Sequence, residues 1–168
     1  MSLKTLVAVA AAAPLMTACI SMSRSEAVAP VAADIARDGR VETVTLTNTV
    51  DADVGPDFKS IFESEVKAKL DACATGQRPL ILEATVSSYS RTNPVITTVL
   101  VGRNRIRGEA VLKDAATGAE VGRYKIGKTI VGGRVAIVEM GPARKQLSEA
   151  FGDEVCKQAF AKGAAAGA

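Results

Sequence analysis

Residues 103–130 read RNRIRGEAVLKDAATGAEVGRYKIGKTI, which is the pattern of a long β-hairpin. In 103–113 the apolar side chains of Ile106, Ala110 and Leu112 share one face, and charged side chains take the other. The segment 114–118, Asp-Ala-Ala-Thr-Gly, supplies a turn with glycine where a positive φ is expected, and 121–130 returns as the second strand. The alternation predicts an antiparallel pair with one face against a core and one face in water.

Five basic side chains gather on the water-facing side of this predicted hairpin. They are Arg103, Arg105, Arg107, Arg123 and Lys125, with Glu109 as an internal counter-charge. Like charges opposed across strands repel, unless an anion or a carboxylate lies among them. One interpretation is a contact surface for an anionic glycan, for lipid headgroups or for an acidic protein partner. The other interpretation is the ordinary solvent face of an antiparallel sheet.

Two further strands and two helices are predicted around the hairpin. Residues 41–47 and 79–89 alternate as strands do, and a helix that begins at Gly55-Pro56 and ends at Gly76 joins them. Its apolar stripe recurs at spacings of three and four and consists of Phe58, Ile61, Phe62, Val66, Leu70 and Cys73. A second helix begins at Gly141-Pro142 and extends to about residue 162, with an apolar residue at every fourth position: Leu147, Phe151, Val155 and Ala159.

These elements follow one another in the order β-α-β-β-β-α. Strands joined by hairpins and covered by helices indicate an α+β fold, a two-layer sandwich. We expect a mainly antiparallel sheet of three to four strands with both helices on one face. The sequence leaves the structure of residues 95–101 and 131–141 open.

The N-terminus has the features of an export signal. Lys4 precedes an apolar run from Leu6 to Met16, which is too short for the roughly 20 residues that span a bilayer. The run closes in Leu15-Met16-Thr17-Ala18-Cys19, which resembles the lipobox of bacterial lipoproteins. That resemblance implies cleavage after Ala18 and acylation of Cys19, with palmitate or a similar chain. An ordinary secretory signal with a nearby Ala-x-Ala-like site is the alternative.

The resemblance also implies a division of the chain. Residues 1–18 are the lipoprotein signal peptide, 19–38 the lipidated cysteine and a flexible tether, 39–162 a single α+β domain and 163–168 a frayed tail. In the lipoproteins of well-studied Gram-negative bacteria, aspartate after the cysteine retains the protein in the inner membrane. Ile20 occupies that position here and favours the outer membrane, with the domain facing the periplasm.

The other two cysteines, Cys73 and Cys156, fall in the last turns of the two predicted helices. An exported protein meets an oxidising compartment, so one structural disulfide is expected between them. The spacing is not the Cys-x-x-Cys of a redox pair, and two buried free thiols are the remaining alternative.

Several classes of function are disfavoured by composition. The chain has 168 residues and no histidine, which excludes Ser-His-Asp and Cys-His catalysis and His-ligated zinc. Its formal charge of +3 is too small to indicate a nucleic-acid partner. The sequence Asp51-Ala-Asp53-Val-Gly55 lacks the carboxylate that completes a calcium loop, and no phosphate-binding glycine motif occurs. We therefore expect no metal, no cofactor and no enzymatic activity.

The lipobox, the β-α-β order, the Arg105-Ile-Arg107-Gly108 strand and the 114–118 turn together resemble small uncharacterised Gram-negative envelope lipoproteins. Their folded part looks like the N-terminal domain of the translocation protein TolB. The resemblance implies a lipid-anchored, periplasm-facing binding or scaffold lipoprotein that contacts the membrane through its lipid and binds an envelope protein or an anionic envelope component. The alternative is an auxiliary subunit of an envelope transport or assembly system, with lipid or another small ligand held between helices and sheet.

Overall fold

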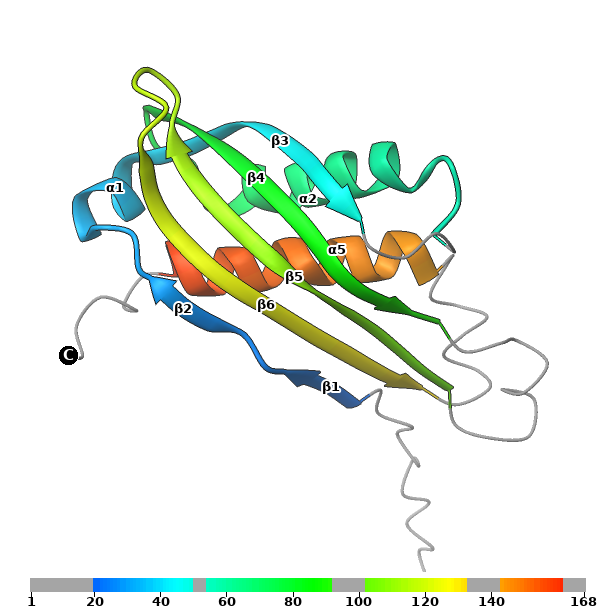
Figure 1. Cartoon of the computed structure of the whole chain (residues 1–168). Coiled ribbons are helices and arrows are strands. Elements are labelled where there is room, and N and C mark those ends of the chain that lie inside the picture. The colour runs from blue at the N-terminus through cyan, green and yellow to red at the C-terminus, as the bar shows by residue number, and fades with distance from the viewer. Residues whose placement is uncertain (1–19, 50–53, 92–101, 133–142, 162–168) are drawn as a thin grey trace, which may run out of the picture.

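The computed structural model describes residues 20–49, 54–91, 102–132 and 143–161. They form two layers, a long twisted sheet and a pair of helices that cover one of its faces (Figure 1). The α+β two-layer class predicted from the sequence is confirmed. Cys19, residues 95–101, residues 133–141 and the tail 163–168 lie outside the described residues, so the expectations for them stay predictions.

The elements of this fold come in three groups along the chain. The N-terminal group is β1 (Ile20–Ser23), β2 (Glu26–Ala29) and α1 (Ala33–Asp38). The middle group is β3 (Gly39–Thr49), α2 (Phe58–Cys73) and β4 (Arg78–Ser90). The C-terminal group is β5 (Gly102–Asp114), β6 (Glu120–Gly132), α5 (Ala143–Val155) and the short π-helix η2 (Cys156–Phe160).

The sheet is larger than expected and it is mixed. It has six strands in the order β1-β6-β5-β4-β3, with β2 also paired to β6. The expected sheet of three to four mainly antiparallel strands is therefore wrong in size, and the order β-α-β-β-β-α lacks two strands and a helix. Strands β3 and β4 run parallel because α2 crosses over between them, which is how parallel neighbours are connected.

The predicted tether of residues 20–38 is corrected by the structure. This segment forms β1, β2 and α1, and it continues the sheet along the free edge of β6. Val31 and Ile35 join the core, and the backbone N–H of Val31 donates to the hydroxyl of Tyr124 at 2.9 Å. The folded domain therefore begins at residue 20 among the described residues, rather than at residue 39.

The hairpin of β5 and β6 forms as the alternation predicts. Ile106, Ala110 and Leu112 are fully buried, and the arginines of the opposite face point away from the helices. Asp114 organises the turn, because its Oδ1 accepts hydrogen bonds from the backbone N–H of Ala116 and Thr117, both at 3.1 Å. Gly118 has a φ of +70°, the left-handed conformation expected for glycine at that position.

The two long helices are joined to each other as well as to the sheet. Their buried stripes meet at Phe62 and Phe151, whose ring centroids are 5.1 Å apart. Gly152 lets the helices approach closely, since a Cβ there would lie 2.8 Å from the Cβ of Lys69. The predicted disulfide between Cys73 and Cys156 is present, with a Cα–Cα distance of 5.9 Å, and it joins the last residue of α2 to the first residue of η2, directly after α5.

Candidate anion-binding face

The register of the sheet places three arginines and two apolar side chains on one surface. Residues directly opposite one another in an antiparallel pair point to the same face. Ile20 of β1 is opposite Val131 of β6, which is opposite Arg103 of β5. In the next outward row Met22, Thr129 and Arg105 are aligned in the same way. This surface is the side of the sheet away from α2 and α5.

Arg24 extends the group in the following row. Its backbone N–H donates to the carbonyl of Gly127 at 2.8 Å, and Gly127 is opposite Arg107. Glycine is required there, because a Cβ on Gly127 would lie 2.9 Å from the carbonyl oxygen of Arg24. Arg24 belongs to the segment that the sequence analysis assigns to a tether, so it was missed as a site residue.

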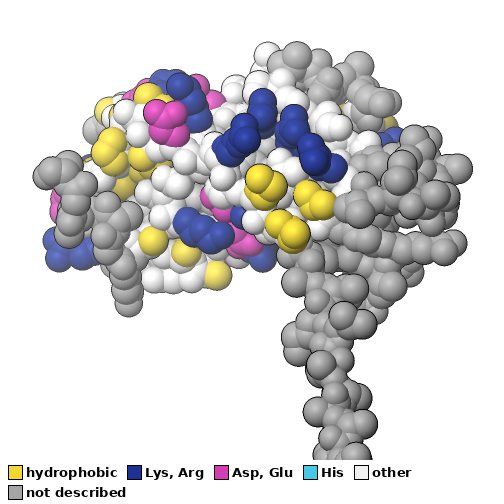
Figure 2. All heavy atoms as spheres, turned by 90° about the horizontal axis from the view of Figure 1, so that it is seen from below, with side chains coloured by type: hydrophobic (Ala, Val, Ile, Leu, Met, Phe, Trp, Pro, Cys, Tyr) yellow, Lys and Arg dark blue, Asp and Glu magenta, His cyan; other side chains and the backbone are white. Residues whose placement is uncertain are grey.

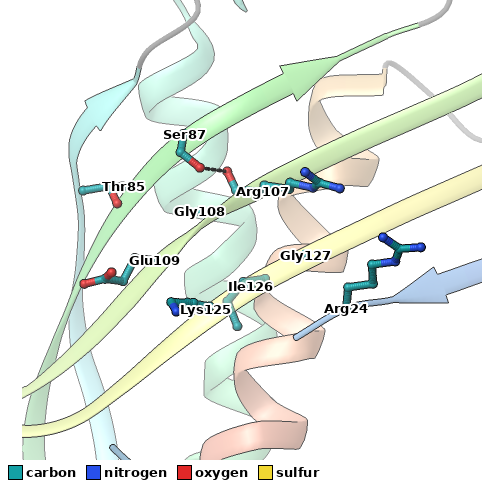
Figure 3. Close-up of a pocket in the computed structure, with 9 residues that line it drawn as sticks. All are labelled: Arg24, Thr85, Ser87, Arg107, Gly108, Glu109, Lys125, Ile126 and Gly127. Carbon is teal, nitrogen blue, oxygen red and sulfur yellow. Dashed lines mark hydrogen bonds between the residues drawn. The ribbon is translucent and has the colours of Figure 1, made fainter. Parts of the chain in front are cut away.

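We define the basic face as Arg24, Arg103, Arg105, Arg107 and Lys125. Three of these residues, Arg24, Arg107 and Lys125, line a depression of about 410 Å³ on the outer side of the sheet. Figure 3 shows the guanidinium groups of Arg24 and Arg107 at one end of this depression and Glu109 at the other. The floor is open because small residues line it, namely Thr85, Ser87, Gly108 and Gly127. Its shape and charge suit an anionic group.

A second, smaller depression of about 130 Å³ lies beside the first. It is lined by Met22 and Arg24 from the N-terminal segment and by Arg103, Arg105 and Arg107 from β5, with residues 127–129 of β6. The Nε of Arg105 is buried and has no hydrogen-bond partner among the described residues. No described carboxylate lies within ion-pair distance of Arg24, Arg105, Arg107 or Lys125. Lys125 lies opposite Glu26 and Glu109 in the register, so the charge that is available to an external anion is that of Arg24, Arg105 and Arg107.

Arg123 does not belong to this group, although the sequence predicts it there. Its guanidinium contacts Glu109 and donates to Glu120, with the Nε–Oε1 distance to Glu120 at 2.8 Å. Hydrogen bonding with Glu120 raises the pKa of Arg123 above its ordinary value and lowers the pKa of Glu120. Arg123 is neutralised by its own neighbours. Of the five predicted basic residues, the structure brings Arg103, Arg105, Arg107 and Lys125 together.

Exposed apolar side chains adjoin the basic face. Ile20 and Met22 are 62% and 51% exposed. Figure 2 views the molecule from the edge of the sheet formed by β1 and β2, and shows a group of basic side chains next to hydrophobic ones. Both side chains belong to the edge strand β1, which begins at the first described residue. They lie in the same cross-strand rows as Arg103 and Arg105.

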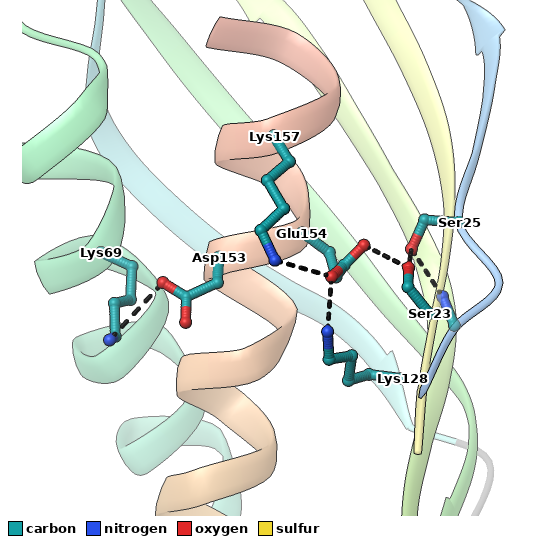
Figure 4. Close-up of polar contacts among 8 residues, drawn as sticks. Ser23, Ser25, Lys69, Lys128, Asp153, Glu154 and Lys157 are labelled. Atoms are coloured by element: carbon teal, nitrogen blue, oxygen red, sulfur yellow. Dashed lines mark hydrogen bonds and ion pairs between the residues drawn. The ribbon is translucent and has the colours of Figure 1, made fainter. Parts of the chain in front are cut away.

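A buried ion pair fixes β1 against the rest of the domain. Glu154 of α5 is 2% exposed and accepts a hydrogen bond from the Nζ of Lys128 in β6 at 2.7 Å. Its other oxygen accepts from the hydroxyl of Ser23 in β1 (Figure 4). Burial would raise the pKa of Glu154, but the hydrogen bonds from Lys128, Ser23 and Ser25 outweigh it and lower the pKa to about 2.

The sequence contained a signal for this pair that was not used. Lys128 follows Tyr124 and Ile126 at a spacing of two, so it points to the same buried face of the sheet. Glu154 lies three residues after Phe151, on the buried side of its helix. When a strand and a helix each carry one charged residue at a position where the pattern expects an apolar one, the two residues are expected to form a buried ion pair. The pairing also explains why the N-terminal strand has a defined position.

Within the part of the chain that the structure describes, no group of three or more His, Cys, Asp or Glu side chains is placed to hold a metal ion. Among the same residues, no helix has the length and the apolar character needed to cross a bilayer.

The fold is similar to that of solved structures at low sequence identity. A PelC dodecamer from Paraburkholderia phytofirmans aligns with 85% of this chain and 100% of its own, at 17% identity and a TM-score of 0.53. A second PelC dodecamer from that organism, a variant with a leucine replaced by methionine, covers 77% and 97% of the two chains, at 18% identity and a TM-score of 0.44. A candidate lipoprotein from Caulobacter crescentus covers 68% and 85%, at 16% identity and a TM-score of 0.41. No family model matches the chain, and no curated protein matches its sequence. The likeness to the first of these structures shows that the two chains share a fold.

Proposed function

We propose that this protein is a lipid-anchored, periplasm-facing binding or scaffold lipoprotein of the bacterial envelope. One observation carries the proposal: Arg24, Arg105 and Arg107 converge on one sheet face without a carboxylate partner among the described residues. Like charges held together repel, and an external anion relieves that repulsion. The basic face is therefore the surface that contacts an anionic component of the envelope.

The anchor is supported by the sequence before the sheet. Cys19 closes a segment that resembles a lipobox, and β1 begins at the next residue. A single acyl chain binds a membrane only marginally, whereas the two or three chains of bacterial lipoproteins hold firmly. An outer-membrane location follows from Ile20 after the cysteine and is part of the proposal.

The ionised state of the buried side chain of Glu154 favours a binding role over acid–base catalysis by this residue. Glu154 engages both of its oxygens in hydrogen bonds, and its low pKa keeps it ionised at neutral pH. A general acid or base needs a pKa near the working pH. The chain also has no histidine.

The proposal is tested by crosslinking in cells. A photoreactive amino acid in place of Lys125 would report what lies on the basic face, with both proteins and lipids scored. We expect the double variant Arg105→Glu, Arg107→Glu to lose the captured component. The matched control is Arg37→Glu with Arg40→Glu, which makes the same charge change on α1 and β3, where both residues are exposed. Equal capture by both double variants would contradict a role for the basic face.

A second candidate is the auxiliary subunit of an envelope transport or assembly system. The chain shares its fold with a protein that forms a dodecamer, which favours testing assembly of copies of this chain. The space between helices and sheet, where the sequence analysis places a ligand, is filled by core side chains such as Phe58, Phe62 and Phe151. A ligand would instead occupy the 410 Å³ depression. Native mass spectrometry of the envelope-derived protein would show bound lipid and the number of copies together.

A further inference from the structure

We infer that the basic face, together with Ile20 and Met22, lies directly against the phospholipid headgroups of the membrane that carries the anchor. This inference rests on the proposed acylation of Cys19 and names the anionic component that the proposed function leaves open. It assigns the domain one orientation, with the β1 edge of the sheet on the lipid surface.

No spacer separates the proposed anchor, Cys19, from the first strand of the sheet. Ile20 is the first residue of β1, and it is paired with Val131. One residue spans at most about 3.6 Å of chain. An acylated Cys19 would therefore hold the start of β1 within a few ångströms of the lipid headgroups. A domain on a flexible tether could stand away from the membrane, but this one cannot.

The second step is that β1 cannot swing away from the domain. Its four residues pair with β6, and Ser23 bonds to the buried carboxylate of Glu154. Arg24 is fixed in turn by its hydrogen bond to Gly127. The side chains beside the anchor are therefore presented to the membrane as one surface.

The third step is the chemistry of that surface. Ile20 and Met22 are exposed apolar side chains at the point where the acyl chains leave the protein. Arg103 and Arg105 lie in the same cross-strand rows, and Arg24 and Arg107 follow. Guanidinium groups bind phosphate oxygens through paired hydrogen bonds, and apolar side chains beside them enter the boundary between headgroups and acyl chains.

At the opposite end of the sheet, near the turn between β5 and β6, the basic side chains are paired with carboxylates. Near the hairpin turn Arg123 contacts Glu109 and Glu120, and Lys113 contacts Glu83 at 2.7 Å. Arg24, Arg105 and Arg107, which have no carboxylate partner among the described residues, lie at the anchor end instead. An anionic membrane would orient the domain with that end toward the lipid. The apolar pair beside the arginines favours a membrane over a soluble polyanion.

The test uses the fact that the chain has no tryptophan. Met22→Trp introduces a single fluorophore into the proposed contact surface. Ala116→Trp is the matched control, because residue 116 is exposed in the turn beyond the far end of β5, and the strand from Arg105, in the row of Met22, to Asp114 is about 30 Å long. The acylated full-length variants are reconstituted into vesicles of phosphatidylcholine with phosphatidylglycerol, and quenching by brominated phospholipid is measured. We expect about twofold or greater quenching for Met22→Trp relative to Ala116→Trp.

The arginine contribution is tested in the same Met22→Trp background. Arg105→Gln with Arg107→Gln should reduce quenching in the anionic vesicles, while Arg37→Gln with Arg40→Gln should not. Circular dichroism would show that each variant is folded. Quenching that is the same with both pairs of substitutions would overturn the assignment of headgroups to the basic face.

Flotation of the vesicles separates this inference from the proposed function. Protein that floats with the vesicles while Met22→Trp remains unquenched would overturn the orientation but leave the anchor intact. Protein whose mass lacks acyl chains and that does not float would overturn the anchor, and the orientation with it. A response of Met22→Trp emission to heparin or polyglutamate, with none to vesicles, would assign the face to a soluble polyanion or an acidic protein and would overturn the inference.

Discussion

The hydroxyl of Ser23 in β1 donates a hydrogen bond to the carboxylate of Glu154 in α5, 131 residues further along the chain. The same carboxylate bonds to Lys128 in β6, so the edge strand, the sheet and the helix layer meet at one buried charge. This contact makes the N-terminal segment part of the domain. It determines how the basic face stands relative to Ile20, the first described residue.

Removal of the buried carboxylate of Glu154 is expected to lower the free energy of unfolding strongly. Glu154→Gln leaves the ammonium group of Lys128 buried without its counter-charge, and breaking such a pair costs on the order of 3–5 kcal/mol. Urea unfolding of the variant would measure the loss. The double variant Lys128→Met, Glu154→Leu is the control, because apolar residues of similar size restore most of the stability of a buried pair. Equal destabilisation of the single and double variants would show that charge is not the cause.

The same group predicts a dependence of stability on pH. The pKa of Glu154 in the folded protein, about 2, lies below its ordinary value of 4.5. Its stabilising contribution is therefore complete above about pH 5 and is lost as the pH falls through the folded-state pKa. The free energy of unfolding should fall from pH 5 toward pH 2, and Glu154→Gln should make that fall shallower. An unchanged acid profile in the variant would contradict the low pKa.

Ser23→Ala is predicted to loosen β1 without unfolding the domain. The variant loses a hydrogen bond to a charged acceptor, and the expected cost is about 1.5–3 kcal/mol. Hydrogen exchange of the backbone amides paired between β1 and β6 should quicken, while exchange in β4 and β5 should not. Ser21→Ala is the matched control, since Ser21 is exposed in the same strand. Equal exchange rates in the two variants would rule out anchoring by Ser23.

The disulfide is expected to contribute substantially to stability. Cys73 and Cys156 are separated by 83 residues, and closing a loop of that length contributes about 4–5 kcal/mol as an upper value. The double variant Cys73→Ser, Cys156→Ser should lower the urea midpoint, and the wild-type protein should match it when dithiothreitol is present. Labelling of two thiols in denaturant without reductant would show that the bridge is absent.

Gly152→Ala tests how closely the helices pack. Alanine ordinarily favours a helix over glycine by about 1 kcal/mol. At this position the added Cβ would lie 2.8 Å from the Cβ of Lys69 and 3.2 Å from the Cα of Val66. Overpacking should outweigh propensity, with a net loss of about 1–3 kcal/mol by thermal or urea unfolding. A stabilised variant would mean that α2 and α5 lie further apart.

The sequence predicts those elements whose pattern is local and long. Strands β5 and β6 alternate apolar and polar residues over 13 residues each, and α2 carries an apolar stripe of Phe58, Phe62, Val66 and Leu70. In both cases the sequence of the element alone identifies its buried face. The disulfide was also predictable, because both helix ends carry a cysteine. Period and composition are sufficient in such cases.

The rest depends on partners that are remote in sequence. Strands β1 and β2 have four residues each and are exposed, so no buried period marks them, and only the free edge of β6 gives them order. Missing these strands removed Arg24 from the candidate site. The neutralisation of Arg123 by Glu109 and Glu120 becomes evident only once the register is known.

We propose that lipid on Cys19, one residue before β1 begins, holds the domain at a membrane. The most direct measurement is the intact mass of the protein isolated from its own host's envelope. We predict the mass of residues 19–168 with one internal disulfide plus the mass of two or three acyl chains. A mass without acyl chains would contradict the account, because nothing would then hold the basic face at a lipid surface.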